Sequence, residues 1–413
     1  MKEKLFTRSY IAACITNFFY QIALYSLVPI LALYLIDTFQ SDRTEVGLVL
    51  ACYAISTLLI RPFCGHLLDI ADRKKTYIIA LVCFTIIFVG YPIASTIALF
   101  ALLRVAHGLA LGFLAVSANT IVIDISPSSR RGEGIGYYGI MNNLAMAIGP
   151  ATAVYVQQQF GYSQVFNMAL ASSCIAMVCG FFVKTKKKKA AVPQAVTEQP
   201  ASEYNKKFLV SLDRFILIKG LPAGFNLFLL AIPYGMITTF IALYSEELEL
   251  GRGTGLFFTC MAVGIILSRL LGGRSVDKGH LLDTVKTGIV ICVVSIAMLA
   301  GTYLFTDDHT TTKLIFNASA LLTGLGYGLI FPGMNTLFVN LARHNQRGTA
   351  SATYMTTWDV GIGLGMLMGG YIGDMSNYSV VFLIGAVCNA LSALFFVYYT
   401  KQHYIKNKLE GTN

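Results

Sequence analysis

The chain is divided into apolar stretches of about 20 residues or more, which is the length that an α-helix needs to cross a lipid bilayer. Six stretches fall at about 9–36, 45–68, 76–94, 97–123, 134–157 and 163–183, and six more at 221–244, 253–273, 284–304, 313–340, 349–373 and 378–400. Only 13% of the residues are charged, against about 25% in soluble domains. We therefore predict an all-α membrane protein with twelve transmembrane helices.

A polar tract separates the two sets of six. Lys184–Lys189 is nearly all lysine, and the Pro-, Ala-, Gln- and Glu-rich run that follows to Asn205 has no apolar period, which is typical of a flexible linker. Residues 206–219 mix Lys, Arg and Asp with Phe and Leu, which predicts a short helix in the membrane interface. The expected organisation is a six-helix bundle over 1–183, a cytoplasmic linker over 184–220, and a second bundle with a tail over 221–413.

The basic residues predict the orientation in the membrane. Outside the helices, only Arg43, Arg252 and Lys313 fall on the side away from the termini, so the positive-inside rule places both termini in the cytoplasm and the chain in the inner (plasma) membrane. The sequence has no basic stripe with interleaved aromatic residues, so we do not expect nucleic acid as a partner. The nine cysteines lie in or beside apolar segments without a Cys-x-x-Cys pair, so we expect no metal site and no cofactor.

An internal repeat relates the two halves. Arg61, Gly65 and Asp69 recur as Arg269, Gly273 and Asp277. A second block, Gly108, Gly112, Asn119, Thr120, Arg131 and Gly132, recurs as Gly324, Gly328, Asn335, Thr336, Arg347 and Gly348. Parallel repeats of this kind enclose a site near the membrane midplane and expose it to each side in turn. We expect the second, fifth, eighth and eleventh helices to hold the halves together.

The connection after the second helix carries Gly65-His-Leu-Leu-Asp69-Ile-Ala-Asp-Arg73-Lys. This segment resembles the loop signature of the major facilitator superfamily, Gly-x-Leu-Ala-Asp-Arg-x-Gly-Arg-Lys. The resemblance implies that Arg73 bridges to a carboxylate at the inner end of the fourth helix, where this chain has Asp124. Gly65, Asp69, Arg73 and Asp124, with Gly273 and Asp277 in the repeat, are then a conformational latch for the outward-open state.

Two further segments are similar to motifs of that superfamily. Arg104-Val-Ala-His107-Gly in the fourth helix resembles Arg-x-x-Gln-Gly, which implies a role in proton coupling. His107 either titrates there or packs as a hydrogen-bonded histidine. Gly136, Gly149 and Pro150 in the fifth helix match part of an antiporter signature of small residues, which predicts bending of that helix. The motifs together point to the twelve-helix drug:proton antiporter branch.

Asp359 is the one acidic residue near the middle of a predicted span, roughly 15 Å deep. A carboxyl group at that depth is neutral or paired with a cation, as proton coupling requires, or is bonded to a neighbouring helix to set its packing. We assign proton coupling to Asp359, with Arg104 nearby. The repeat aligns Asp359 with Asn143, next to Asn142.

Other polar and aromatic groups at similar depth predict an amphipathic, aromatic solute cavity with few fixed charges. The candidate solute-binding residues are Asn17, Tyr20, Gln21, Tyr25, Asn142, Asn143, Asn226, Tyr234, Tyr354 and Trp358.

The prediction is a monomeric, proton-coupled exporter of small amphipathic or drug-like solutes. The alternatives are a symporter that imports a nutrient and, more remotely, a membrane receptor. No nucleophile with its base is evident, so we do not expect an enzyme.

Overall fold

The computed structural model describes residues 4–70, 72–127, 130–185, 216–250, 253–277, 280–342 and 346–408. The side chains of 62, 65–70, 131–133, 143, 253, 269–277, 347 and 348 are not described. The predicted interfacial helix at 206–219 lies almost wholly outside these ranges, as does most of the linker. Its last described residues form the 3₁₀ turn Ile218–Gly220.

Twelve long helices make up the described chain, in two sets of six. The first set is α1 (Arg8–Phe39), α2 (Arg43–Ile70), α3 (Arg73–Gly90), α4 (Ile97–Ile125), α5 (Arg131–Phe160) and α6 (Tyr162–Phe181). The second is α8 (Leu221–Glu247), α9 (Gly253–Asp277), α10 (Leu281–Gly301), α11 (His309–Leu341), α12 (Arg347–Met375) and α13 (Tyr378–Phe395). Each agrees with a predicted span to within a few residues, so the predicted fold class is confirmed. The last helix continues further than predicted, through the π-helix Phe396–Thr400 into α14 (Lys401–Asn407).

Short polar side chains begin several helices where the apolar runs start. Thr7, Asp72, Thr96, Asp308 and Asn377 each accept a hydrogen bond from a backbone N–H in the first turn of the following helix, which satisfies donors that lipid cannot. Asp72 explains a difference from the sequence prediction. Because Asp72 caps α3, the new helix begins at Arg73, and α2 continues up to Ile70. Gly65 and Asp69 therefore lie in the last turns of α2 and not in a turn between helices.

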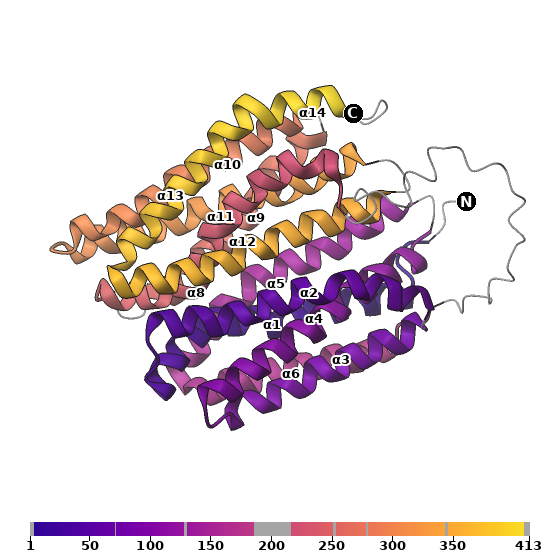
Figure 1. Cartoon of the computed structure of the whole chain (residues 1–413), viewed down its shortest axis with the longest axis horizontal. Helices are drawn as coiled ribbons and strands as arrows, with labels where there is room; N and C mark the ends of the chain where they lie inside the picture. Colours follow the sequence, from indigo (N-terminus) through magenta and orange to yellow (C-terminus); the bar gives the residue numbers. More distant parts are fainter. Residues whose placement is uncertain are drawn as a thin grey trace, which may run out of the picture.

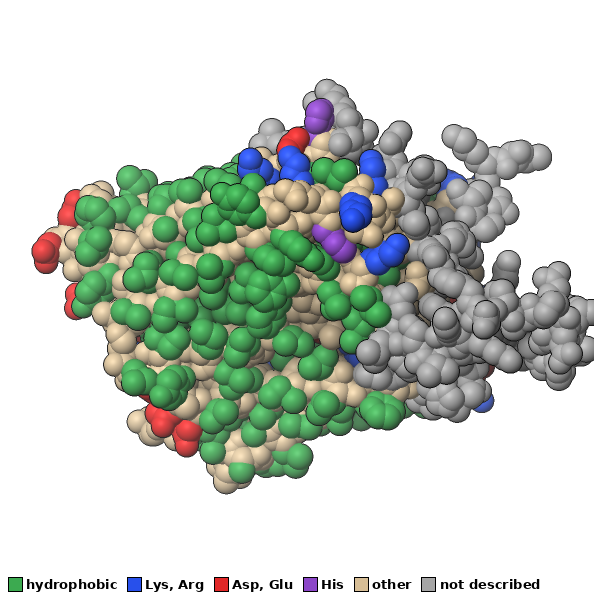
Figure 2. Space-filling view, turned by 45° about the horizontal axis from the view of Figure 1, so that its top comes forward, with side chains coloured by type: hydrophobic (Ala, Val, Ile, Leu, Met, Phe, Trp, Pro, Cys, Tyr) green, Lys and Arg blue, Asp and Glu red, His purple; other side chains and the backbone are tan. Residues whose placement is uncertain are grey.

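The two sets lie side by side, α1–α6 in one half and α8–α14 in the other (Figure 1). The start of α1 and the end of α14 lie at the same end of the bundle, which we call the terminus end. The other end is called the opposite end. Nine helical segments in the described chain are long and apolar enough to cross a membrane. Apolar side chains cover the face shown in Figure 2, with basic side chains gathered toward the terminus end and most of the acidic ones at the opposite end.

The repeat is visible in how the helices pack within each half. Gly108 in α4 lies against the Tyr53 carbonyl of α2, and its counterpart Gly324 in α11 lies against the Met261 carbonyl of α9. At both glycines a Cβ atom would collide with the neighbouring backbone. Small residues therefore set the same close helix approach in both halves.

The halves meet along two main seams, α2 with α12 and α5 with α9, and α1 also contacts α8. These are the second, eleventh, fifth and eighth spans, so the expected interface is confirmed. In the first seam the backbones touch: a Cβ on Gly47 would lie 2.6 Å from the Met366 carbonyl oxygen, and one on Gly370 would collide with the Arg43 carbonyl.

Candidate functional site

An ion pair joins the two halves in the middle of the bundle. Arg61 of α2 places Nη2 2.5 Å from Oδ2 of Asp359 in α12. The side chains are only 13% and 23% exposed, so the charges are largely removed from solvent. The second terminal nitrogen of Arg61, Nη1, is buried without a hydrogen-bond partner among the described residues. Arg61 therefore retains a donor that a bound solute or water could use.

Arg104 lies in the same region but makes a different contact. Its guanidinium carbon is 4.5 Å from the ring centroid of Tyr53 in α2, a cation–π arrangement. Tyr53 is within electrostatic range of Arg104, Arg61 and Asp359. The side chain that pairs with Asp359 is thus Arg61, and Arg104 joins the group through Tyr53.

His107 is enclosed by aromatic rings inside the first half. It is fully buried, and its Nδ1 lies 2.7 Å from the Tyr91 hydroxyl. The rings of Phe84 and Phe88 make edge-to-face contacts with it, at centroid distances of 4.8 and 5.0 Å. The Tyr53 ring of α2 lies 5.7 Å away on a further side. All these contacts come from the first half, and they fit the packing alternative for His107.

Aromatic side chains of the second half gather close to Asp359. The Trp358 ring is 5.0 Å from Tyr234 and 4.7 Å from Phe331. Tyr25 of α1 packs against the same cluster from the first half, and its hydroxyl donates to Asn142 Oδ1 at 3.3 Å. The structure thus brings together four of the predicted solute-binding residues: Tyr25, Asn142, Tyr234 and Trp358. Tyr354 borders the cluster through a 3.4 Å bond to the Phe331 carbonyl.

Other predicted solute-binding residues lie within one half. Asn17 donates to the Tyr138 carbonyl at 2.9 Å, and Tyr20 packs its edge on Phe84. Asn226 is fully buried and bonded to Ser392. Their positions serve helix packing. Gln21 is part-buried on α1, and the Asn143 side chain lies outside the described residues.

The latch residues that are described lie at the terminus end. Arg73 Nη1, at the start of α3, is 2.5 Å from Asp124 Oδ2 at the end of α4, so this pair ties two helices of the first half. The side chains of Asp69 and Asp277 and the surroundings of Gly65 and Gly273 are not described.

The three α5 residues differ in their surroundings. Gly149 lies against α1, where a Cβ would be 2.9 Å from the Tyr25 Cβ, and Pro150 follows it inside the continuous helix. Gly136 has no described atom within 4 Å of its Cβ position. The close approach at Gly149 is therefore within the first half.

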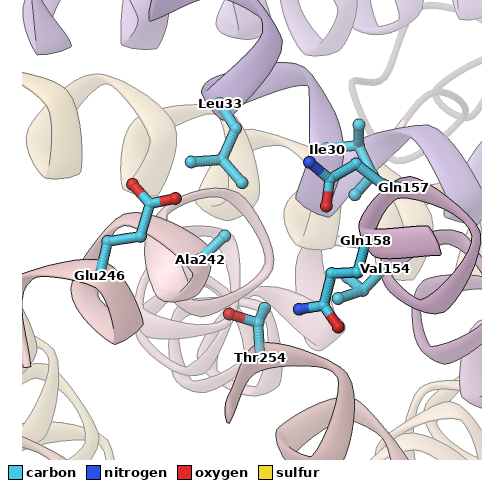
Figure 3. Close-up of a pocket in the computed structure, with 8 residues that line it drawn as sticks. All are labelled: Ile30, Leu33, Val154, Gln157, Gln158, Ala242, Glu246 and Thr254. Carbon is cyan, nitrogen blue, oxygen red and sulfur yellow. The ribbon is translucent and has the colours of Figure 1, made fainter. Parts of the chain in front are cut away.

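A cavity of about 280 Å³ lies near the opposite end, between α1, α5, α8 and α9. Gln158 and Thr254 face it across the α5–α9 seam, with Glu246 on the other side (Figure 3). Its remaining lining is Ile30, Leu33, Val154, Gln157 and Ala242. Sequence analysis did not identify this space, because its residues come from four helices and carry no motif.

Comparison with known proteins identifies the family. The sequence model described as Major Facilitator Superfamily matches residues 13–366 and 279–412. The chain belongs to the Major Facilitator Superfamily. It is accordingly a multi-pass membrane transporter of small molecules and not an enzyme.

Several named transporters are similar to this chain in sequence or in structure. A staphylopine export protein of Staphylococcus aureus is 22% identical over 83% of this chain and 84% of that protein. The quinolone resistance protein NorA of the same species is 23% identical over 92% and 94%. Among solved structures, a peptide transporter bound to sulfate superposes with a TM-score of 0.76 at 13% identity, covering 99% of this chain and 98% of the other. A nucleoside transporter gives 0.70 at 14% identity, covering 94% and 99%.

Arg61 is a partner of Asp359 that the sequence analysis does not assign to the site, although it places Arg61 in the repeat. Its signal was available: Asp359 and three arginines, Arg61, Arg104 and Arg269, lie within the spans, and charges at that depth are expected to pair. The sequence alone could therefore identify Arg61 as one of three candidate partners of Asp359. Choosing it over Arg104 and Arg269 required the contact between α2 and α12.

Neutralising the latch should impair the transport cycle without unfolding the protein. The Arg73–Asp124 pair is 23% and 35% exposed, so its contribution to stability is at most about 1 kcal/mol. We expect Asp124→Asn to keep the melting temperature and to lower turnover severalfold in proteoliposomes. Asp283→Asn is the matched control, because Asp283 forms an exposed 3.9 Å pair with Lys401 near the same end of the bundle. Equal turnover in both variants would contradict a role for the latch.

Proposed function

We propose that the chain is a proton-coupled exporter of small amphipathic solutes, acting as a monomer in a bacterial plasma membrane. The observation that carries the proposal is the Arg61–Asp359 pair, which joins the halves beside an aromatic cluster. The names of the staphylopine exporter and the quinolone resistance protein support export and an amphipathic solute.

The pair supplies a chemical basis for coupling. An ionised Asp359 attracts Arg61 and favours contact between α2 and α12 at mid-depth. A proton on the carboxyl removes that attraction and leaves Arg61 without its counter-charge, at a depth where an unpaired cation is costly. Movement of Arg61 toward water or a solute then accompanies protonation. Protonation of one carboxyl thus biases the halves between two arrangements.

The distribution of charge supports placing both termini in the cytoplasm. Basic side chains gather toward the terminus end and most of the visible acidic ones at the opposite end (Figure 2). Asp37, Glu45, Glu246, Asp308 and Asp374 are among the acids at the opposite end. Lysine and arginine are retained on the cytoplasmic side of membrane proteins.

Transport in everted membrane vesicles tests the proposal. Vesicles containing the protein are expected to accumulate cationic or neutral amphipathic dyes when the lumen is acidified, and to lose them when a protonophore collapses the gradient. Vesicles without the protein give the background. Accumulation in right-side-out vesicles under an inward proton gradient would instead indicate the importing symporter. Transport unchanged by the protonophore would contradict proton coupling.

A further inference from the structure

The carboxylate of Asp374 caps a helix of the other half. Asp374 lies in the last turn of α12, and its oxygens accept hydrogen bonds from the Arg43 backbone N–H at 2.9 Å and the Thr44 backbone N–H at 2.7 Å. The Thr44 hydroxyl also donates to it. These two backbone groups begin α2 and have no partner within their own helix. A negative charge at that position is further favoured by the helix dipole.

The side chain of Arg43 strengthens the same junction in the reverse direction. It donates from Nη1 to the Gly373 carbonyl at 2.5 Å, and its guanidinium carbon is 4.6 Å from the ring centroid of Tyr378 at the start of α13. Hydrogen bonds therefore run both ways between the first turn of α2 and the last turn of α12. Both helix ends belong to the opposite end of the bundle.

Among the residues that the structure describes, the α5–α9 seam shows no such cap. Extending the repeat alignment that pairs Arg131 with Arg347 to the far ends of α5 and α12 places Gln158 at the position of Asp374. Gln158 carries no charge, and it borders the cavity of about 280 Å³ between α5 and α9. At the opposite end one seam is thus tied by a charged cap, and its pseudo-symmetric counterpart contains open space.

We propose that Asp374 is a conformational lock, which caps α2 only while the opposite end is closed and must release α2 before that end can open. The inference rests on the alternating-access part of the proposed function, and it needs neither protons nor a particular solute. The cap is formed between halves that must separate in the cycle, so it stabilises one state and not the fold of either half.

Hydrogen–deuterium exchange of the full-length protein in lipid nanodiscs tests the lock. Asp374→Ala is expected to speed exchange roughly three- to tenfold at the start of α2, and also at the start of α9, which Asp374 does not touch. Faster exchange at both places means that the whole opposite end opens more often. Arg43→Gln should act in the same direction with a smaller effect.

Asp42→Ala is the matched control. Asp42 caps α2 from within the first half, through a 2.6 Å bond from the Glu45 N–H, so its loss should speed exchange at the start of α2 alone. If Asp374→Ala gives that same local pattern, Asp374 is an ordinary helix cap and the lock is refuted. The measurement uses no solute and no gradient, so it succeeds or fails separately from the vesicle experiment on transport.

Discussion

Asp359→Asn is expected to abolish accumulation against a gradient, because it removes the titrating group that joins the halves while keeping its shape. Arg61 then loses its partner at 2.5 Å. Removing one member of a buried pair costs about 3–5 kcal/mol, and the partial exposure here reduces this to roughly 1–3 kcal/mol. Transport of a neutral solute down its own gradient should persist, because it needs no proton. Proteoliposomes with imposed solute and proton gradients separate the two activities.

A second substitution distinguishes coupling from stability. The double variant Arg61→Gln with Asp359→Asn removes both charges, so it should recover most of the lost thermal stability. It should still fail to couple transport to protons. Restored uphill transport in the double variant would show that the pair is structural, and continued proton-driven transport in Asp359→Asn alone would assign coupling elsewhere, with Arg104 and His107 as the remaining candidates.

Gly370→Ala is expected to shift the protein away from the conformation described here. The new methyl group would collide with the Arg43 carbonyl of α2, and inserting one carbon into a tight contact costs about 1–3 kcal/mol. The population with the α2–α12 contact made at the opposite end, relative to the population with that contact broken, should fall by roughly 5- to 150-fold. Exchange at the starts of α2 and α9 would rise, and turnover would fall as the closed state becomes rare.

Gly136→Ala provides the comparison for that variant. A Cβ at Gly136 meets no described atom within 4 Å, so the substitution should gain up to about 1 kcal/mol of helix propensity and leave the conformational ratio unchanged. Gly47→Ala, on α2, would place a Cβ 2.6 Å from the Met366 carbonyl oxygen of α12. It should therefore shift the conformational ratio as Gly370→Ala does. If all three variants exchange alike, the seam is not close-packed in the membrane.

Helix positions were predictable because the length and apolarity of a span follow from bilayer thickness. α4, predicted at 97–123, is observed at Ile97–Ile125. The partner of a buried charge was not predictable in this way, because Asp359 and Arg61 come from different halves and meet only when α2 packs on α12. Motif resemblance did suggest the neighbours Arg73 and Asp124, and the two are in contact.

The direction in which a polar side chain points from its helix was the main feature that the sequence could not predict. In a soluble helix the polar face marks the exposed side. In lipid both the outward and the inward faces are apolar, so depth can be read from sequence but rotation cannot. Asn226 and Tyr234 lie two turns apart on α8, yet Asn226 bonds to Ser392 and Tyr234 packs against Trp358. Both were equally good candidates before the rotation of α8 was known.

The backbone contact between α2 and α12 has a consequence for how such a protein can diversify. At Gly47 and Gly370 the two halves contact each other through main-chain atoms. Substitutions of side chains elsewhere leave these main-chain atoms in place. The aromatic residues beside Asp359 can therefore be exchanged for others without altering the surface on which the halves move. New solute preferences can arise in this aromatic cluster while the moving parts are inherited unchanged, provided that those two positions remain glycine.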